Sequence, residues 1–170
     1  PDLLSRSRTL KVWSAGCSTG EEPYSLTIIL LEKAAGRFHK VIATDIDRQV
    51  LEKAQKGIYS SKTVSSVPEP WLKKYFVQND GNFIIKDEVK KWLSFQQHDL
   101  LKDSYPSNCD LILCRNVVIY FTEEAKTRLY QRFQQALKKG GVLFIGSTEQ
   151  IFQARELGLR SIATFFYQKI

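Results

Sequence analysis

The sequence contains no methionine, three cysteines, two histidines and no long hydrophobic run. A membrane-spanning helix needs about 20 consecutive apolar residues, and no signal-peptide pattern is present, so we expect a cytoplasmic protein without membrane insertion. Cys17, Cys109 and Cys114 are odd in number and lack CxxC spacing, which argues against a disulfide framework and against a metal site. Because even position 1 is not methionine, we expect the chain to be a piece of a longer protein.

The chain is basic, with 25 Lys and Arg against 18 Asp and Glu and a formal net charge of +7. An excess of this size points to an acidic partner, which could be nucleic acid, an anionic membrane or an acidic protein surface. The basic residues are spread along the chain, with local excesses at 6–11 and 86–91 and no arginine-rich tail. Charge alone therefore does not choose the partner.

Short apolar runs alternate with helical periodicity, which predicts an α/β fold with a mostly parallel sheet. We expect strands over 10–15, 41–44, 92–96, 110–114, 142–146 and 163–169, and helices over 22–35, 47–55, 122–138 and 149–157. Asp47 is expected to cap the second helix and Gly57 to end it. Lys139-Gly140-Gly141 is expected to end the third.

Residues 57–91 interrupt this alternation. Asn79-Asp80-Gly81-Asn82 lies between apolar flanks, and these residue types accept the left-handed conformations of a tight hairpin turn. We therefore expect a single domain over residues 1–170 with a small antiparallel β insertion at about 57–91.

The segment 12–25 predicts a buried strand, a turn of small residues and the start of a helix. Gly16, Ser18 and Gly20 leave little side-chain bulk, so backbone N–H groups of the turn could approach a ligand closely. Glu21 and Glu22 then disfavour a phosphate, because two carboxylates at a helix start favour a cationic group or an amine and hydroxyls. S-adenosylmethionine carries all of these groups.

Polar residues follow several of the expected strands, where an open parallel sheet binds its ligands. Asp45 ends the second strand, and a carboxylate there can accept both ribose hydroxyls of an adenosine while repelling a 2′-phosphate. Asp99 could accept the adenine amine, with Leu100 against the ring, or could simply be a turn residue.

Arg115 and Asn116 emerge from a buried strand, which is costly unless each finds partners, so they either bind a ligand or tie down the neighbouring loop. Tyr120, four residues further on, is expected at the same rim. His39 is expected in a surface loop and His98 at a strand end.

Three segments, 13–25 (WSAGCSTGEEPYS), 43–47 (ATDID) and 114–121 (CRNVVIYF), resemble the CheR-type chemoreceptor methyltransferases. The resemblance covers about residues 10–169. It implies the class I S-adenosylmethionine-dependent methyltransferase fold, Rossmann-like with a mostly parallel seven-stranded-type sheet. It also implies an enzyme, a protein-glutamate O-methyltransferase that esterifies glutamates on chemoreceptors and leaves S-adenosylhomocysteine.

The resemblance also implies roles for individual residues. It places Glu22 near the methionine part of the cofactor, Asp45 on the ribose, and Asp99 and Leu100 around adenine. Tyr120 lies near the transferred methyl group, and Tyr120 and Arg115 are the two residues assigned to catalysis. The full cofactor-binding set is Gly16, Ser18, Thr19, Glu22, Asp45, Asp99, Leu100, Arg115 and Asn116. The implied partner is the acidic helical signalling domain of a chemoreceptor, with no nucleic acid, and the enzyme is expected to be a monomer.

The sequence departs from this family at three points. The family's basic N-terminal helical domain and its Phe-Phe-Arg linker are not in this sequence. Asp99 stands where many relatives have Asn, which keeps an acceptor for the adenine amine. The turn at 79–82 is short beside members that tether to a receptor's C-terminal peptide, so we do not expect tethering.

Three alternatives remain open. Gly16-Cys17-Ser18-Thr19-Gly20 fits the G-x-S-x-G nucleophile elbow of a hydrolase, although an elbow does not follow the first strand and no acid and histidine are well placed for Ser18. A non-catalytic module derived from the same family could bind the cofactor or dock a protein without turnover. A nucleic-acid methyltransferase would suit the charge, but its Asn/Asp-Pro-Pro-aromatic motif is missing.

Overall fold

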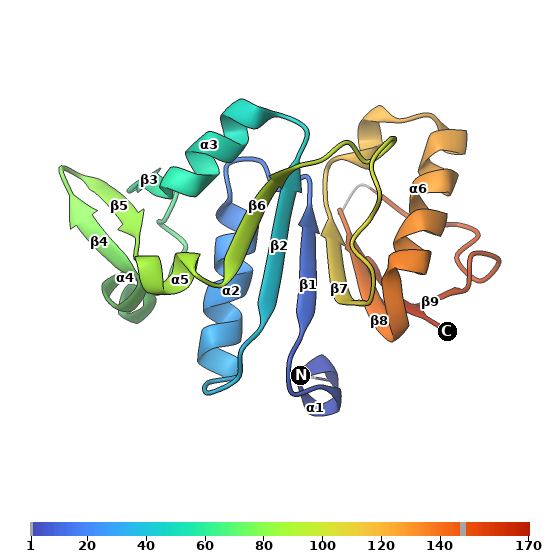
Figure 1. Cartoon of the computed structure of the whole chain (residues 1–170), viewed down its shortest axis with the longest axis horizontal. Coiled ribbons are helices and arrows are strands. Elements are labelled where there is room, and N and C mark those ends of the chain that lie inside the picture. Colours follow the sequence, from blue (N-terminus) through green and yellow to red (C-terminus); the bar gives the residue numbers. More distant parts are fainter. Residues whose placement is uncertain (1, 147–148) are drawn as a thin grey trace.

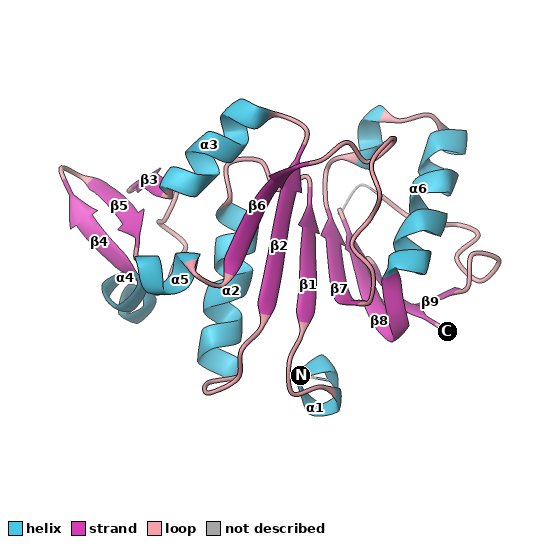
Figure 2. Cartoon of the chain, in the orientation of Figure 1, coloured by secondary structure: helices cyan, strands magenta, loops and turns pink. Residues whose placement is uncertain are grey.

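The computed structural model describes residues 2–146 and 149–170 and has the expected α/β architecture (Figures 1 and 2). The strands of its main sheet are β1 Lys11–Ala15, β2 Lys40–Asp45, β6 Leu93–Gln97, β7 Cys109–Cys114, β8 Leu137–Ile145, β9 Leu159–Ala163 and β10 Phe166–Lys169. They form a seven-stranded sheet in the order β6-β2-β1-β7-β8-β10-β9. The first five strands in this order are parallel, and β10 runs antiparallel to both β8 and β9. The predicted fold class is confirmed.

The helices that flank this sheet are α1 Asp2–Arg6, α2 Glu21–Lys33, α3 Arg48–Lys56 and α6 Glu123–Ala136. Asp47 caps α3, because its side chain accepts a hydrogen bond from the Gln49 N–H at 2.7 Å, and Gly57 ends that helix with φ 63°. Both predictions are confirmed. Among the described residues, no helix is long and apolar enough to cross a membrane.

The central strand β1 is buried on both faces. Val12 packs in one apolar cluster with Leu30 of α2, and Trp13 packs in another with Phe133 of α6, at 5.5 Å between ring centroids. Truncating a fully buried aromatic side chain such as Phe133 costs about 3–5 kcal/mol, so these contacts fix how α2 and α6 sit on the sheet.

The strand order reverses at β1, which pairs with β2 on one side and with β7 on the other. The chain leaves β1 through α2 towards β2 and β6, and β7 and β8 lie on the opposite side (Figure 1). In open α/β sheets, ligands bind in the crevice outside the carboxyl ends of the strands at such a reversal. The topology therefore places the candidate site at the ends of β1, β2 and β7.

The interruption after α3 is a second, antiparallel sheet. It consists of β3 Ile58–Ser60, β4 Phe76–Asn79 and β5 Asn82–Ile85 in the order β3-β5-β4, with the short helices α4 Glu69–Tyr75 and α5 Asp87–Lys90. Asp80 and Gly81 join β4 to β5 with φ 46° and 76°, the pair of positive values that a tight hairpin turn requires. The predicted antiparallel insertion is confirmed as part of the fold.

Three expectations near the C-terminus are wrong. Residues 152–158 form successive turns instead of a helix, although Ile151 and Ala154 are buried, because so short a segment forms too few helical hydrogen bonds to offset the cost of helix nucleation. The expected strand over 163–169 is confirmed only over Phe166–Lys169, as β10, since Phe165 adopts φ 65° and reverses the chain after β9, which was not expected. Lys139-Gly140-Gly141 lies inside β8 as an irregularity opposite β7, and α6 has already ended at Ala136.

His39 is not in a surface loop as expected, since its side chain is 1% exposed. Its Nδ1 accepts a hydrogen bond from the Leu10 N–H at 2.9 Å, at the start of β1. Burial lowers the pKa of the imidazole; the positive charge of Arg37 lowers it further and Asp110 opposes the shift. The folded protein therefore prefers the neutral ring.

We predict that the free energy of unfolding falls as the pH drops below about 6.5, the ordinary pKa of histidine. The unfolded chain then binds a proton that folded His39 resists, so the stability present above that pH is lost on acidification through the folded pKa. Urea unfolding at pH 8 and at pH 5.5 measures this. His39→Asn keeps a δ-position acceptor for Leu10 without titrating, and an equally steep pH dependence in that variant would contradict the assignment.

Candidate functional site

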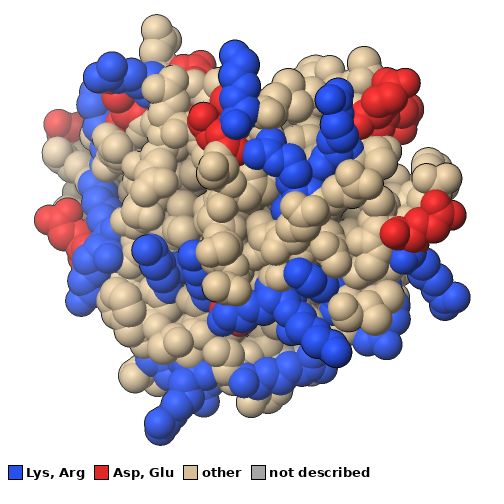
Figure 3. All heavy atoms as spheres, turned by 45° about the vertical axis from the view of Figure 1, so that its right-hand side comes forward, with Lys and Arg blue, Asp and Glu red and all other residues tan. Residues whose placement is uncertain are grey.

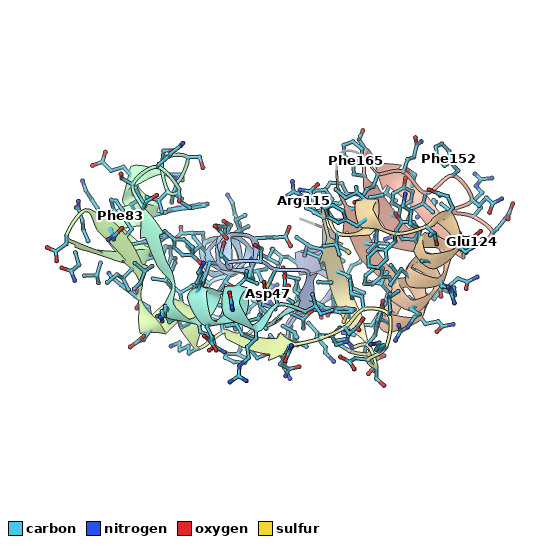
Figure 4. The ribbon with its side chains drawn as sticks, turned by 90° about the horizontal axis from the view of Figure 1, so that it is seen from above. Asp47, Phe83, Arg115, Glu124, Phe152 and Phe165 are labelled. Atoms are coloured by element: carbon cyan, nitrogen blue, oxygen red, sulfur yellow. The ribbon has the colours of Figure 1, made fainter. Side chains whose placement is uncertain are left out.

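A cavity of about 530 Å³ opens where β1, β2, β6 and β7 end. This volume lies within the usual range for small-molecule sites. Its lining is Gly16, Cys17, Ser18, Glu21, Glu22, Asp45, Ile46, His98, Asp99, Leu100, Arg115, Asn116, Val117, Tyr120 and Phe121. We call it the strand-end pocket. Figure 4 looks down on this edge of the sheet, with Arg115 lying between the part that carries Asp47 and the part that carries Glu124 of α6.

The turn after β1 is tied to the end of β2. The N–H groups of Gly16 and Cys17 both donate to the Thr44 carbonyl at 2.8 Å, and the Ser18 N–H donates to Asp45 Oδ2 at 2.9 Å. These three N–H groups are therefore not free to approach a ligand, which corrects the expectation from the sequence. The turn shapes the wall of the pocket and does not form a phosphate cradle.

Gly16 is required by both its conformation and its surroundings. Its φ is 76°, and a Cβ at this position would lie 2.3 Å from Val117 Cγ2. Val117 belongs to the loop after β7, so the absence of a side chain at Gly16 lets the two strand-end loops meet. Their contact closes the base of the strand-end pocket.

Asp45 is held by two backbone donors and retains free acceptor capacity. Its Oδ2 accepts from Ser18 N–H at 2.9 Å and its Oδ1 from Asp47 N–H at 3.0 Å. A carboxylate offers about four acceptor positions, so two remain for a ligand. This arrangement suits a pair of neighbouring hydroxyls, as on a ribose.

Glu22 brings a partly buried carboxylate to the same pocket. Its Oε1 accepts from the Ser14 hydroxyl at 2.8 Å, and its Oε2 lies 3.7 Å from Arg115 Nη1. Burial raises the pKa of Glu22, while the Ser14 hydrogen bond and the Arg115 charge partly oppose the shift. A cationic or amine group of a ligand would stabilise the ionised form of this carboxylate.

Asp99 and Leu100 form the pocket wall beyond β6. Asp99 Oδ1 accepts from the Leu101 N–H at 2.9 Å, so this side chain also shapes its own turn. Arg132 of α6 supports the turn, because its guanidinium donates to the carbonyls of Leu100, at 2.5 Å, and Asp103. The role of Arg132 was not predicted, because no local sequence pattern indicates that an arginine in a helix donates to the carbonyls of a distant loop.

Asn116 lies at the start of the loop after β7, with φ 60°. A Cβ on Gly146 would lie 2.9 Å from Asn116 Oδ1 and 2.8 Å from Glu149 Oε2, so Gly146 allows these groups to pack closely. The buried Glu149 accepts a hydrogen bond from the Gly146 N–H at 2.6 Å. Glu149, which was not predicted from the sequence, thus holds the backbone that follows β8, next to Asn116.

Tyr120 is at the rim of the pocket, with 83% of its side chain exposed. Thr19 is the predicted residue that does not line the pocket: its hydroxyl donates to Glu21 and its carbonyl accepts from the Tyr59 hydroxyl of β3 at 2.8 Å. The antiparallel insertion therefore supports the turn after β1.

Among the described residues, no hydrogen bond joins the Ser18 hydroxyl to a histidine, so the structure does not support the hydrolase alternative.

The pocket also contains residues that the sequence analysis did not assign to the site, among them Ile46, Val117 and Phe121. Each directly follows a polar residue that was assigned to the site. Their position just after a strand end could therefore have predicted them as pocket residues. His98 lines the pocket, but its Nε2 faces the Ser104 carbonyl at 3.1 Å.

Comparison with known proteins shows a family match over most of the chain. The family model described as CheR methyltransferase, SAM binding domain, matches residues 2–164. A chemotaxis protein methyltransferase of Listeria innocua is 44% identical over 170 residues, covering 99% of this chain and 65% of that protein. The protein of the same name from Escherichia coli is 40% identical, covering 85% of this chain and 53% of that protein. The chain thus spans somewhat less than two thirds of these relatives.

Solved structures agree on the fold. The S-adenosylmethionine-dependent methyltransferase SibL has a TM-score of 0.51 at 17% identity, covering 85% of this chain and 32% of that one. PKMT2 of Rickettsia typhi in complex with AdoHcy has a TM-score of 0.51 at 16% identity, covering 81% and 21%. At these identities the likeness concerns the fold alone.

We predict that Gly16→Ala lowers the free energy of unfolding by about 3 kcal/mol, through backbone strain and overlap with Val117. Gly36→Ala is the matched control, because Gly36 has φ 78° but nothing within 4 Å of its missing Cβ. The control should lose only the backbone term, about 1 kcal/mol. Urea unfolding of both variants measures the difference, and equal losses would show that the Gly16–Val117 contact does not constrain the fold.

Proposed function

The chain belongs to the CheR methyltransferase family of SAM-binding domains, and we propose that it transfers the methyl group of S-adenosylmethionine to glutamate side chains of chemoreceptors. One observation carries the proposal: Asp45 and Glu22, on either side of the Gly16 turn, face a single cavity of about 530 Å³. The described lining includes four acidic residues, Glu21, Glu22, Asp45 and Asp99, and one arginine, Arg115. A sulfonium ligand with an amino group and no phosphate fits this charge.

We assign the cofactor contacts on the same basis. The free acceptor positions of Asp45 suit the ribose hydroxyls, and Glu22 suits the amino group of the methionine part. Asp99 and Leu100 suit adenine, because Asp99 Oδ2 has only an exposed ion pair with Lys102, at 3.7 Å, and keeps acceptor capacity for the exocyclic amine. Arg115 and Asn116 suit the opposite flank of the cofactor, next to the rim where Tyr120 stands.

The proposed reaction requires no general acid or base from the protein. When bound, S-adenosylmethionine supplies an electrophilic methyl group; its transfer to a glutamate oxygen forms a methyl ester and leaves S-adenosylhomocysteine. A glutamate carboxylate is already ionised at neutral pH, so no residue needs to remove a proton. The chain's residues therefore hold and orient the two reactants and exclude water from them. Such positioning can lower the free-energy barrier of a reaction by up to about 7–11 kcal/mol in favourable cases.

The proposed acceptor is an acidic helical receptor domain, which suits the net charge of +7. Figure 3 shows Lys and Arg spread over the face turned forward, most densely in its lower half. The proposal includes action as a monomer in the cytoplasm, with residues 1–170 as one domain. A cofactor-binding module without turnover is the alternative that the assay below separates.

We predict that Asp45→Ala weakens binding of S-adenosylhomocysteine by about 1.5–3 kcal/mol, the range for a lost hydrogen-bonding partner with charge. Asp47→Ala is the matched control, because Asp47 caps α3 through Gln49 and does not line the pocket. Isothermal titration calorimetry measures both. Equal affinities for the two variants would contradict the ribose assignment.

The direct test is transfer of a tritiated methyl group from the cofactor to a chemoreceptor signalling fragment by the full-length protein, with release of labelled methanol in base as the mark of an ester. Tyr120→Phe should lower kcat about ten-fold, which corresponds to about 1.4 kcal/mol, and leave cofactor affinity nearly unchanged, because Tyr120 is largely exposed. Cofactor binding without any transfer by the unmodified protein would favour the non-catalytic module.

A further inference from the structure

The acidic side chains of the strand-end pocket lie on one side of it. Glu21 and Glu22 come from α2, Asp45 from the end of β2 and Asp99 from the turn after β6. The opposite wall, which follows β7, consists of Arg115, Asn116, Val117, Tyr120 and Phe121 and has no acidic residue. A carboxylate acceptor is repelled by the first wall and not by the second, so charge favours approach from the β7 side.

A second hollow of about 480 Å³ lies on that side, between α6 and the turns at 149–157. Its lining includes Ile119, Tyr130 and Phe152, together with Lys126, which forms an ion pair with Glu123 at 2.9 Å, and the buried Glu149. The 3₁₀ turn η1, Val118–Tyr120, separates the two hollows, because Tyr120 lines the strand-end pocket while its neighbour Ile119 lines the second one. We call the surface formed by Ile119, Tyr120 and Phe152 the η1 ridge.

The ridge exposes large apolar side chains. Tyr120 is 83% exposed, Phe152 87% and Ile119 44%. Figure 4 shows Phe152 on the α6 side of the molecule, beyond Arg115 as seen from Asp47. Exposed aromatic and branched side chains gathered beside a ligand pocket are typical of a contact surface, and aromatic residues are common anchors in interfaces.

We propose that the receptor helix bearing the acceptor glutamate lies across the η1 ridge, with its apolar side chains on Ile119 and Phe152. This inference rests on the proposed function. Side chains three or four residues apart on a helix lie on one face, so a single helix presents its glutamate at the rim by Tyr120 and an apolar residue to Phe152. The helix thereby avoids the acidic wall formed by α2 and β2.

Phe152→Ala in the full-length protein tests this surface. We expect the KM for a chemoreceptor signalling fragment to rise about ten-fold, with kcat at saturation and the affinity for S-adenosylhomocysteine nearly unchanged. Phe38→Ala is the matched control, because Phe38 is also exposed, at 63%, but lies against Trp92 and lines a hollow at the amino ends of the strands, with Leu10 and Lys40. An unchanged KM in Phe152→Ala overturns the docking surface.

A crosslinking experiment tests the contact independently. The three cysteines of this sequence are buried, so Phe152→Cys adds an accessible thiol to this part of the protein, which a benzophenone maleimide can label. We expect light-induced crosslinks to the receptor fragment near its methylated glutamates, and none from Phe38→Cys. Normal methylation without crosslinks, and with an unchanged KM, overturns the inference alone. Absence of methylation by the unmodified protein overturns the proposed function and this inference with it.

Discussion

The site depends on how the chain turns at the end of β1. Gly16 and Cys17 are fixed to the Thr44 carbonyl, Ser18 is fixed to Asp45, and the missing side chain of Gly16 admits Val117 from the other side. Because this turn joins the ends of β2 and β7, the strand reversal at β1 becomes a closed pocket base. The same N–H groups are thereby used up, so the turn cannot bind a phosphate as a glycine-rich loop commonly does.

Electrostatics then selects the ligand and the direction of approach. Burial raises the pKa of Glu22, and Asp45 and Asp99 add negative charge on the same wall, so a cationic group gains most by binding there. The wall after β7 has Arg115 and no acid. A cofactor with a positive end and an acceptor with a negative end can therefore meet over one pocket from opposite sides.

The sequence predicts much of the fold because the signals there are local. Asp47 and Gly57 bound α3 by capping chemistry, and Asp80-Gly81 forms a turn that few other residues allow. The errors at 149–157 and at Lys139-Gly140-Gly141 arose where tertiary packing decides between turn, strand and helix. His39 was misplaced for the same reason, since only the folded chain brings it to the Leu10 N–H. Arg132 donates to the carbonyls of Leu100 and Asp103, which are far away in the sequence, so no local pattern indicates its role.

Two ligands that share adenosine but differ at its 5′ end distinguish a pocket for S-adenosylmethionine from a phosphate site. Calorimetric titration of the protein with S-adenosylhomocysteine and with adenosine 5′-monophosphate compares the affinity for an adenosine that carries an amino-acid group with that for one that carries a phosphate. We predict saturable binding of S-adenosylhomocysteine at least ten-fold tighter than that of the monophosphate, because Glu22 favours an ammonium group and the N–H groups of Gly16, Cys17 and Ser18 already have partners. Equal or tighter binding of the monophosphate would contradict it.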